Sequence, residues 1–472
     1  MKKSTIILPL LLVTALSAQD RMPPKESLEA CISKQEGTIC SFIGPRDEKE
    51  SGVCEYTPDN QYFACKPERP DDNQRAQRDN QNNQENRRQN TPKYSIEQAI
   101  SNNAQTNTIS FAAMSFMSSQ LCEMSFLPPG KHASYFGFQY LRDVVGGKAG
   151  HEQNFVPTVA NNLLYILTSK QKSILIDLAK KQQEKIEKFA LMRFPLLMTF
   201  EKYSNNEFPS GTTKLNKEQV INQSKNLYSL DGELSFQRAI GFAKVIESLT
   251  KNQKNELNKF KTLEYASWPN KQAQINKRNF NHEVHVAIMT YASELFSWYL
   301  GDVKKDTYFT PERTASYFGA YWTKAAPMKA VKRDNYRIST SLTSNSGMQF
   351  LDSLNNNHRS KIKNLVKEQK TYLKQMVDIR ENISKETRKI FNGERNNLEK
   401  IVQLSEKFGE LDGEIAYLYA NSFSDIKNNL TSSQLKKATD LRNISQYQCK
   451  GAFIYAEPTN TPKVYNLEKF FK

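Results

Sequence analysis

Six charged side chains recur at matching places in the two halves of this 472-residue chain, and their types are suited to chemistry. They are Arg193, Asp231, Glu233, Arg380, Asp412 and Glu414. Inward carboxylates in a helical bundle can act as general acids and bases, and an arginine beside them can bind an anion. The same residues can also pair with one another inside the bundles. We favour structural ion pairs and keep the carboxylate dyad or anion site as the alternative.

Two aromatic pairs and one histidine pair are further candidates. The aromatic residues are expected to be core or interface anchors, with a ligand groove as the alternative: Tyr135, Phe136, Tyr317 and Phe318. His282 and His285 are three residues apart on a predicted helix, a spacing that can present both imidazoles to one metal ion. Their string, His-Glu-Val-His, differs from the His-Glu-x-x-His of zinc proteases. The sequence has no phosphate loop, haem attachment or nucleophile elbow, so an enzyme is the less favoured prediction and no cofactor is expected.

These candidates belong to a larger internal repetition. The string Ala-Ser-Tyr-Phe-Gly at 133–137 returns at 315–319, and Leu-Asp-Gly-Glu at 230–233 returns at 411–414. A weaker match joins 167–171 to 354–358, at a slightly larger offset. Because the matches keep nearly one register, we predict a tandem duplication of a unit of about 180 residues.

The hydrophobic pattern predicts an all-α fold for both copies. Apolar residues recur every three or four positions, with lysines and glutamines on the opposite face. We therefore predict two tandem, related antiparallel helical bundles preceded by a small disulfide-rich module. The predicted divisions are a signal peptide (1–18), the Cys-rich module (19–66), a disordered polar linker (67–93), helical repeats (94–267 and 278–449) and a C-terminal tail (450–472).

Strings of the form Leu-Thr-x-x-Gln have a direct physical meaning as helix caps. The Thr hydroxyl accepts a hydrogen bond from a free amide of the first turn, and the Gln side chain reaches back to the amide of the Thr. A degenerate fourth copy has an Asn cap and His358 in place of the Gln, which makes reciprocal bonding less certain there. The predicted cap residues are Thr168, Gln171, Thr250, Gln253, Asn355, Thr431 and Gln434. They predict four helix starts.

The three complete strings, each opening a charged amphipathic helix, resemble the LTxxQ motif of the Spy and CpxP family of periplasmic proteins. The resemblance covers the motif helices only. It implies an all-helical, cradle-like protein linked to envelope stress, since the family includes an ATP-independent chaperone, a sensor-kinase modulator and metal-responsive relatives. The Cys-rich module resembles short Cys-rich segments of other bacterial secreted proteins.

The chain begins like a secreted protein. Lys2 and Lys3 precede an apolar run and then small residues, the layout of a signal peptide. We therefore expect export to the periplasm or the exterior, with no transmembrane span after cleavage.

An even number of cysteines suits that compartment because exported chains form disulfides. The six cysteines are Cys31, Cys40, Cys54, Cys65, Cys122 and Cys449. The first four would staple a module too short to bury a core, and their pairing is not readable from sequence; a zinc site is the alternative. A bond between Cys122 and Cys449 would close a loop around the duplicated region.

Charge completes the functional prediction. The formal net charge of +16 falls to about +14 without Lys2 and Lys3. This excess of positive charge can attract acidic partners or can simply keep the protein soluble. The sequence contains no recognised nucleic-acid-binding motif. We predict an exported, non-enzymatic helical binding protein, of chaperone-like or envelope-stress type, that engages a protein client or an acidic envelope component. The alternatives are a surface protein anchored by its Cys-rich module, or a metal-handling or enzymatic protein using the repeated charged set; the oligomeric state is open.

Overall fold

The computed structural model describes residues 23–44, 48–57, 62–67, 95–127, 135–146, 155–273, 275–308, 317–325, 341–444, 449–454 and 457–472. The chain divides into two compact units, 1–91 and 92–472, and each is described here by itself. The predicted signal peptide lies outside the described residues, as does the predicted linker apart from Pro67.

The N-terminal unit is a disulfide-stapled sheet with one short helix. Its elements are α1 (Lys25–Glu29), β1 (Ile39–Ile43), β2 (Lys49–Tyr56) and β3 (Phe63–Pro67). The strands are antiparallel in the order β1-β2-β3, so β1 and β3 form the edges. Disulfides join Cys31 to Cys54 and Cys40 to Cys65, and these sulfurs form most of a very small core. Such staples supply stability that a module of this size cannot obtain from apolar burial alone.

The second unit is mostly helical, as predicted. Its first half contains α3 (Ile96–Ala99), α4 (Asn102–Ser118), α5 (Leu121–Ser125), α6 (Phe138–Tyr140), η1 (Leu141–Val145), α7 (Phe155–Ile166), α8 (Ser169–Met192), α9 (Phe194–Ser204), α10 (Lys217–Glu247), α11 (Lys251–Lys259) and η3 (Tyr265–Ser267). Its second half contains η4 (Lys277–Asn279), α12 (His282–Leu300), α13 (Val303–Thr307), α14 (Ala320–Ala325), α15 (Ser341–Ser353), α16 (Asn356–Glu368), α17 (Lys370–Phe391), α18 (Leu398–Asn428) and α19 (Ser432–Arg442). The chain ends with β4 (Ala452–Ile454), β5 (Glu457–Thr459) and η7 (Leu467–Phe470).

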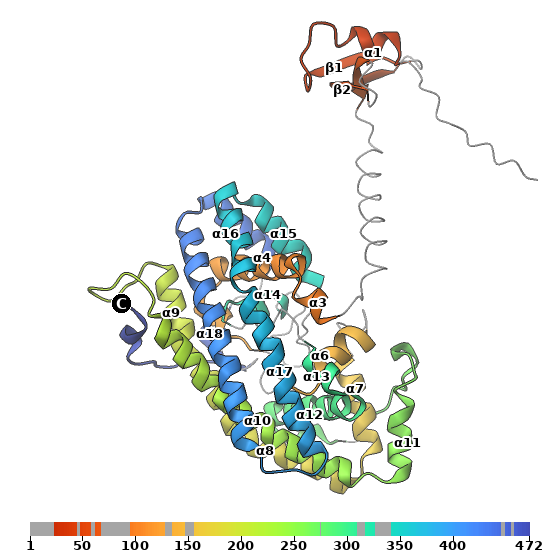
Figure 1. Cartoon of the computed structure of the whole chain (residues 1–472), viewed down its shortest axis with the longest axis vertical. Helices are drawn as coiled ribbons and strands as arrows, with labels where there is room; N and C mark the ends of the chain where they lie inside the picture. The colour runs from red at the N-terminus through yellow and green to blue at the C-terminus, as the bar shows by residue number, and fades with distance from the viewer. Residues whose placement is uncertain are drawn as a thin grey trace, which may run out of the picture. The chain divides into compact units, whose positions relative to one another are not determined.

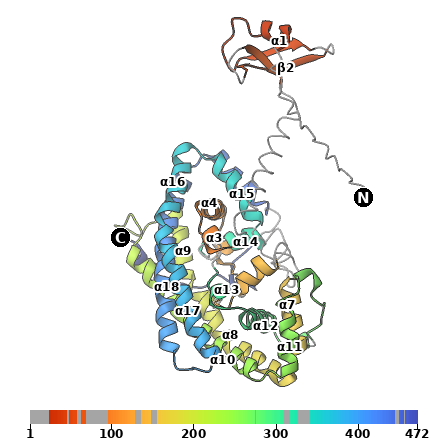
Figure 2. The same ribbon diagram turned by 45° about the vertical axis from the view of Figure 1, so that its right-hand side comes forward.

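The helices of the two halves begin at matching positions. Helices α12, α16 and α18 each start about 180 residues after α4, α8 and α10 respectively, which is the length of the predicted repeat. Helices α10 and α18 each contain 31 residues and are the longest in the described chain. They lie side by side in both views of the molecule (Figures 1 and 2).

The crossing of α10 and α18 is reciprocal and antiparallel. A Cβ built on Gly232 would lie 2.9 Å from the Ser405 Cβ, and one built on Gly413 would lie 3.1 Å from the Ser224 Cβ. The two glycines are counterparts in the repeat, and the two serines are counterparts at the same offset. The glycine of both Leu-Asp-Gly-Glu strings therefore lets one long helix approach the other, under a local two-fold relation like that of a symmetric dimer interface.

The two halves do not form separate bundles, in contrast to the predicted division at 94–267 and 278–449. Helix α4 of the first half packs against α15, α16 and α19 of the second, whereas α12 of the second half packs against α7 and α8 of the first. Figure 2 shows α4 nearly end-on, with α15 and α16 beside it. The halves thus exchange their first long helix inside one compact unit. Helix α4 is buried all round from Thr108 to Met117, and α12 is buried all round from Tyr291 to Trp298. The composition of such segments indicates burial but not which helices cover them.

The C-terminal segment, expected to be a simple tail, is fastened to the helical unit. Cys449 forms the expected disulfide with Cys122 on α5. Phe470 and Phe471 are buried, and the backbone amides of Lys214 and Lys472 each donate to the other residue's carbonyl at 3.1 and 2.9 Å. Among the described residues, no helix is long and apolar enough to cross a membrane.

Candidate functional site

The repeated arginines are buried and each faces a tyrosine from the other half. Arg193, at the end of α8, donates from Nη1 to the Ser125 carbonyl at 3.0 Å, and its guanidinium lies 6.0 Å from the centre of the Tyr317 ring. Arg380, on α17, donates from Nε to the Asp306 carbonyl at 3.0 Å and lies 5.9 Å from the Tyr135 ring. In both contacts an arginine of one half faces a tyrosine of the other half, so these side chains cross between the halves as α4 and α12 do.

The repeated aspartates belong to the same buried region. Asp231 and Asp412 have 0% and 2% of their surface exposed. The pKa of Tyr317 is raised above its ordinary value, first by burial and then by the negative charge of Asp412. Burial lowers the pKa of Arg193, and Tyr317 is the strongest of the groups that oppose this shift. Arginine, tyrosine and aspartate therefore compensate one another inside the crossing, where none of them meets solvent.

The burial of these side chains favours a structural role over a carboxylate dyad or an anion site. This applies to four residues: Arg193, Arg380, Asp231 and Asp412. A general acid or base must reach the proton that it transfers, directly or through one water. The exposed fractions of these four side chains are between 0% and 2%. The cluster places opposite charges near one another at the crossing of α10 and α18, which is the arrangement expected of a structural role.

The two repeated glutamates do not join this cluster. Glu233 pairs with Lys185 at 2.6 Å, and Glu414 pairs with Lys217 at 2.8 Å. Glu233 is partly exposed, and Glu414 is about one-fifth exposed. The expected pairing of these glutamates with Arg193 or Arg380 is therefore replaced by lysine partners on neighbouring helices, because each glutamate follows its aspartate by two residues and projects from a different face of the helix.

The repeated aromatic residues are core anchors rather than the lining of a groove. Tyr135, Phe136, Tyr317 and Phe318 are each at most 1% exposed. Phe318 stacks on Phe200 with ring centroids 5.6 Å apart and an interplanar angle of 8°. The Tyr135 hydroxyl lies 3.3 Å from Ser405 Oγ.

All four predicted helix starts exist, at α8, α11, α16 and α19. Three carry the complete box: Thr168 with Gln171, Thr250 with Gln253, and Thr431 with Gln434. At α16 the Asn355 side chain accepts from the His358 amide at 2.9 Å.

Two of these boxes are joined to each other. Gln171 Nε2 donates to Gln253 Oε1 at 3.2 Å, while Gln253 Nε2 donates to Gln171 Oε1 at 2.7 Å. The N-termini of α8 and α11 are held together by their own caps. At the matching place in the second half, Gln434 Nε2 donates to the Ser353 carbonyl at 3.2 Å.

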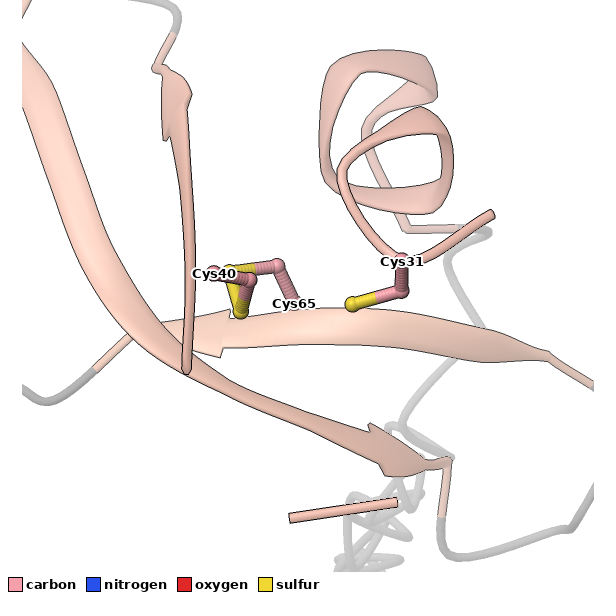
Figure 3. A group of neighbouring side chains, drawn as sticks. All are labelled: Cys31, Cys40 and Cys65. Atoms are coloured by element: carbon pink, nitrogen blue, oxygen red, sulfur yellow. A yellow bond between two sulfur atoms is a disulfide. The ribbon is translucent and has the colours of Figure 1, made fainter. Parts of the chain in front are cut away.

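The histidine pair has protein partners but no convergent ligand set among the described residues. His282 opens α12, and its Nε2 lies 3.4 Å from Glu457 Oε1. Within the described ranges, the His, Cys, Asp and Glu atoms that converge as a metal site would require are those of Cys31, Cys40 and Cys65. Figure 3 shows the Cys40–Cys65 bond, and Cys31 is bonded to Cys54. These sulfurs are committed to disulfides and are not the thiolates that zinc binds.

Sequence reasoning missed a second buried charge network. Arg238 on α10 donates from Nη1 to both carboxylate oxygens of Glu294 on α12 at 3.1 Å, and the side chains are 0% and 1% exposed. Tyr291 donates to Gln182 Oε1 at 2.6 Å, and burial raises the pKa of its phenol to about 12. Arg238 and Glu294 lie outside the repeated strings, so the repeat pattern gave no signal for them.

Exposed apolar side chains are concentrated on the small N-terminal unit. Ile32, Ile39, Ile43 and Tyr56 are 68%, 80%, 59% and 54% exposed. Ile39 and Ile43 project from the same side of edge strand β1, as alternate residues of a strand do. In the much larger helical unit, the described exposed apolar residues are scattered over η1, α7, α8, α18, α19 and connecting segments.

A scan against family models, a search of curated proteins and a search of solved structures each found no match.

Proposed function

We propose that this chain is an exported, non-enzymatic binding protein whose N-terminal disulfide module docks onto an apolar partner, while the helical unit serves as a rigid, basic body. The observation that carries the proposal is the contrast between the two units. The repeated arginines and aspartates of the helical unit are buried, whereas the module exposes isoleucines, and an exposed apolar patch is typical of an interaction surface.

The packing of the two halves of the helical unit against each other supports this division of labour. We infer that its two halves arose by duplication and retained the interface of an ancestral dimer, with the first long helix exchanged between the copies. The matched helix starts and the reciprocal contacts of Gly232 and Gly413 support this inference. The Cys122–Cys449 bond then joins the first half to the C-terminal segment.

The partner of the module is proposed to be the apolar surface of a protein client or of an envelope component. Two disulfides hold the sheet, so Ile39 and Ile43 can stay exposed without collapse of the module. Burying an isoleucine side chain contributes about 1.5–3 kcal/mol, which gives a small module useful affinity from a few contacts.

The test is protection of a chemically denatured client diluted from guanidinium, without reductant so that the disulfides stay closed. The full chain should suppress light scattering, and the Ile39→Ser/Ile43→Ser variant should lose most of that effect. The matched control is Leu263→Ser/Leu398→Ser, which removes two apolar side chains that are 39% and 42% exposed on the helical unit. If the control loses protection and the module variant keeps it, docking through the module is wrong.

The second candidate is a helical factor of the LTxxQ type, with the helical unit itself as the binding body. The three complete capping boxes, two of them bonded to each other, favour it. In the same assay, loss of protection in the Leu263→Ser/Leu398→Ser variant alone would support this candidate over the first.

A further inference from the structure

A straight row of lysines follows one face of α16 and α17. Lys363, Lys367, Lys370 and Lys374 are all exposed and recur at intervals of four, three and four along the sequence. Residues at this spacing lie above one another on a helix. We call these four side chains the lysine stripe.

The stripe is continuous although two helices contribute to it. Gln369, between α16 and α17, has helical dihedral angles of −78° and −13°. The Gln369 amide donates to the Leu365 carbonyl at 3.0 Å, and the Leu373 amide donates to the Gln369 carbonyl at 2.9 Å. The helical path is thus preserved across the junction, and α16 runs on into α17 in Figure 1. The stripe is about 16 Å long at 1.5 Å per residue.

The charges of the stripe are not neutralised within the described protein. None of the four lysines has an ion-pair partner there, and Lys370 donates only to the amide oxygen of Asn102 at 3.2 Å. Lysines elsewhere on these helices are paired, Lys361 with Asp425 and Lys385 with Glu381. Glu368 is turned about 100° from its neighbour Lys367, away from the stripe. Asp378, one turn beyond Lys374, ends it.

The matching face of the first half is used internally, which shows that the fold does not require the stripe. At an offset of 187 the stripe positions correspond to Ile176, Lys180, Gln183 and Glu187 on α8. There Gln183 donates to Glu283 at 2.9 Å, and Lys180 lies 5.7 Å from the centre of the Phe280 ring. In the second half all four positions are lysines with exposed side chains, and none of them has an ion-pair partner in the described part of the chain.

We propose that the lysine stripe is a docking surface for a linear acidic polysaccharide, bearing carboxylates or sulfates along its length. Charge complementarity favours a polyanion, because four unneutralised cations in a row attract charges that are themselves in a row. Lysine ammonium groups act as point charges and suit an irregular series of acidic groups.

The surroundings of the stripe favour a glycan over other polyanions. No described residue of α16 or α17 is among the exposed large apolar or aromatic side chains. Single-stranded nucleic acids are bound by exposed aromatic residues on which bases stack, and membrane-surface helices insert an apolar face. The stripe offers charge without either. This inference is independent of the proposed module docking, since it uses another unit of the chain.

The test measures binding of the full, oxidised chain to a heparin dodecasaccharide and to polygalacturonate by calorimetry across a salt series. The variant changes all four stripe lysines to Gln, which keeps helix propensity. The matched control changes Lys170, Lys181, Lys188 and Lys254 to Gln, with the same loss of charge from exposed positions on α8 and α11. Circular dichroism checks that both variants fold.

We expect the stripe variant to bind about thirty-fold more weakly, from four modest surface contacts, and its salt slope to shrink by about 3. The control should lose much less than this. Equal losses in the two variants would show that net charge alone matters and would overturn the proposal. Binding to single-stranded DNA or anionic vesicles, with no binding to either glycan, would overturn it as well.

Discussion

Gln171 and Gln253 exchange hydrogen bonds through their side-chain amides, at 3.2 and 2.7 Å, while each completes the capping box of its own helix. A cap is ordinarily a local device, worth about 1 kcal/mol to one helix. Here two caps that are distant in the sequence form one buried unit, since Gln171 is 4% and Gln253 is 9% exposed. The repeated string therefore has a tertiary role that its spacing alone does not reveal.

Replacing either glutamine by Ala should destabilise the helical unit by about 1–3 kcal/mol, because the partner amide is left buried with an unmade hydrogen bond. The double variant should cost less than the sum of the single variants. Urea unfolding of all four proteins measures the coupling. The control is Gln434→Ala, whose box at α19 lacks a second glutamine. Additive losses for Gln171 and Gln253 would contradict the coupled arrangement.

His358 should make the helical unit sensitive to acid. Burial, followed by the positive charge of Lys361, lowers the pKa of this imidazole below its ordinary value. The unfolded chain then binds the proton more readily, so the contribution of His358 is complete above about pH 6.5 and is lost as the pH falls below it. His358→Gln should reduce the loss of stability between pH 7 and pH 5. Thermal unfolding across that range tests this, and unchanged pH dependence would contradict it.

Gly232→Ala should destabilise the helix crossing although alanine favours helix. The added Cβ would lie 3.0 Å from the Val402 Cα, a backbone atom that cannot turn aside. We expect a net loss of about 1–3 kcal/mol by overpacking. Gly241→Ala is the matched control, since its Cβ would meet a terminal methyl of Leu178 that can rotate away. Similar midpoints of urea unfolding for the two variants would refute the close-approach role of Gly232.

Glu294→Gln should be strongly destabilising because it removes the carboxylate charge that the buried Arg238 guanidinium binds. Removing one member of a buried pair typically costs about 3–5 kcal/mol, whereas replacing both by apolar residues can be nearly neutral. Arg238→Met/Glu294→Leu should therefore recover most of the stability that Glu294→Gln loses. Denaturant unfolding compares the three proteins. A double variant less stable than the single one would show that the polar network is needed as a whole.

Sequence patterns predicted local structure well and long-range arrangement poorly, because local structure depends on residues that are close in the sequence. The caps at Thr168, Thr250 and Thr431 depend on residues three apart, and all three formed as expected. The repeated aromatic residues were correctly expected in the core. The bond that was considered between Cys122 and Cys449 also forms in the structure.

The exchange of α4 and α12 could not be predicted. The central parts of both helices are buried on every side, and helices of either half can cover them equally well, so periodicity carries no information on that choice. The same limit applies to Arg238 and Glu294, whose pairing joins α10 to α12. The lysine partners of Glu233 and Glu414 could not be predicted either. They depend on how the two long helices α10 and α18 pack against their neighbours, which is a long-range arrangement.

The bond between Cys122 and Cys449 places a condition on how the protein is made. Its cysteines are 327 residues apart, so the native partner of Cys122 is absent until nearly the whole helical unit has been synthesised. The module's own cysteines, separated by 23 and 25 residues, can pair as soon as they emerge. Early closure of the module removes the four thiols that would otherwise compete for Cys122. We therefore expect the short-range disulfides to close first and to leave Cys449 as the remaining partner of Cys122.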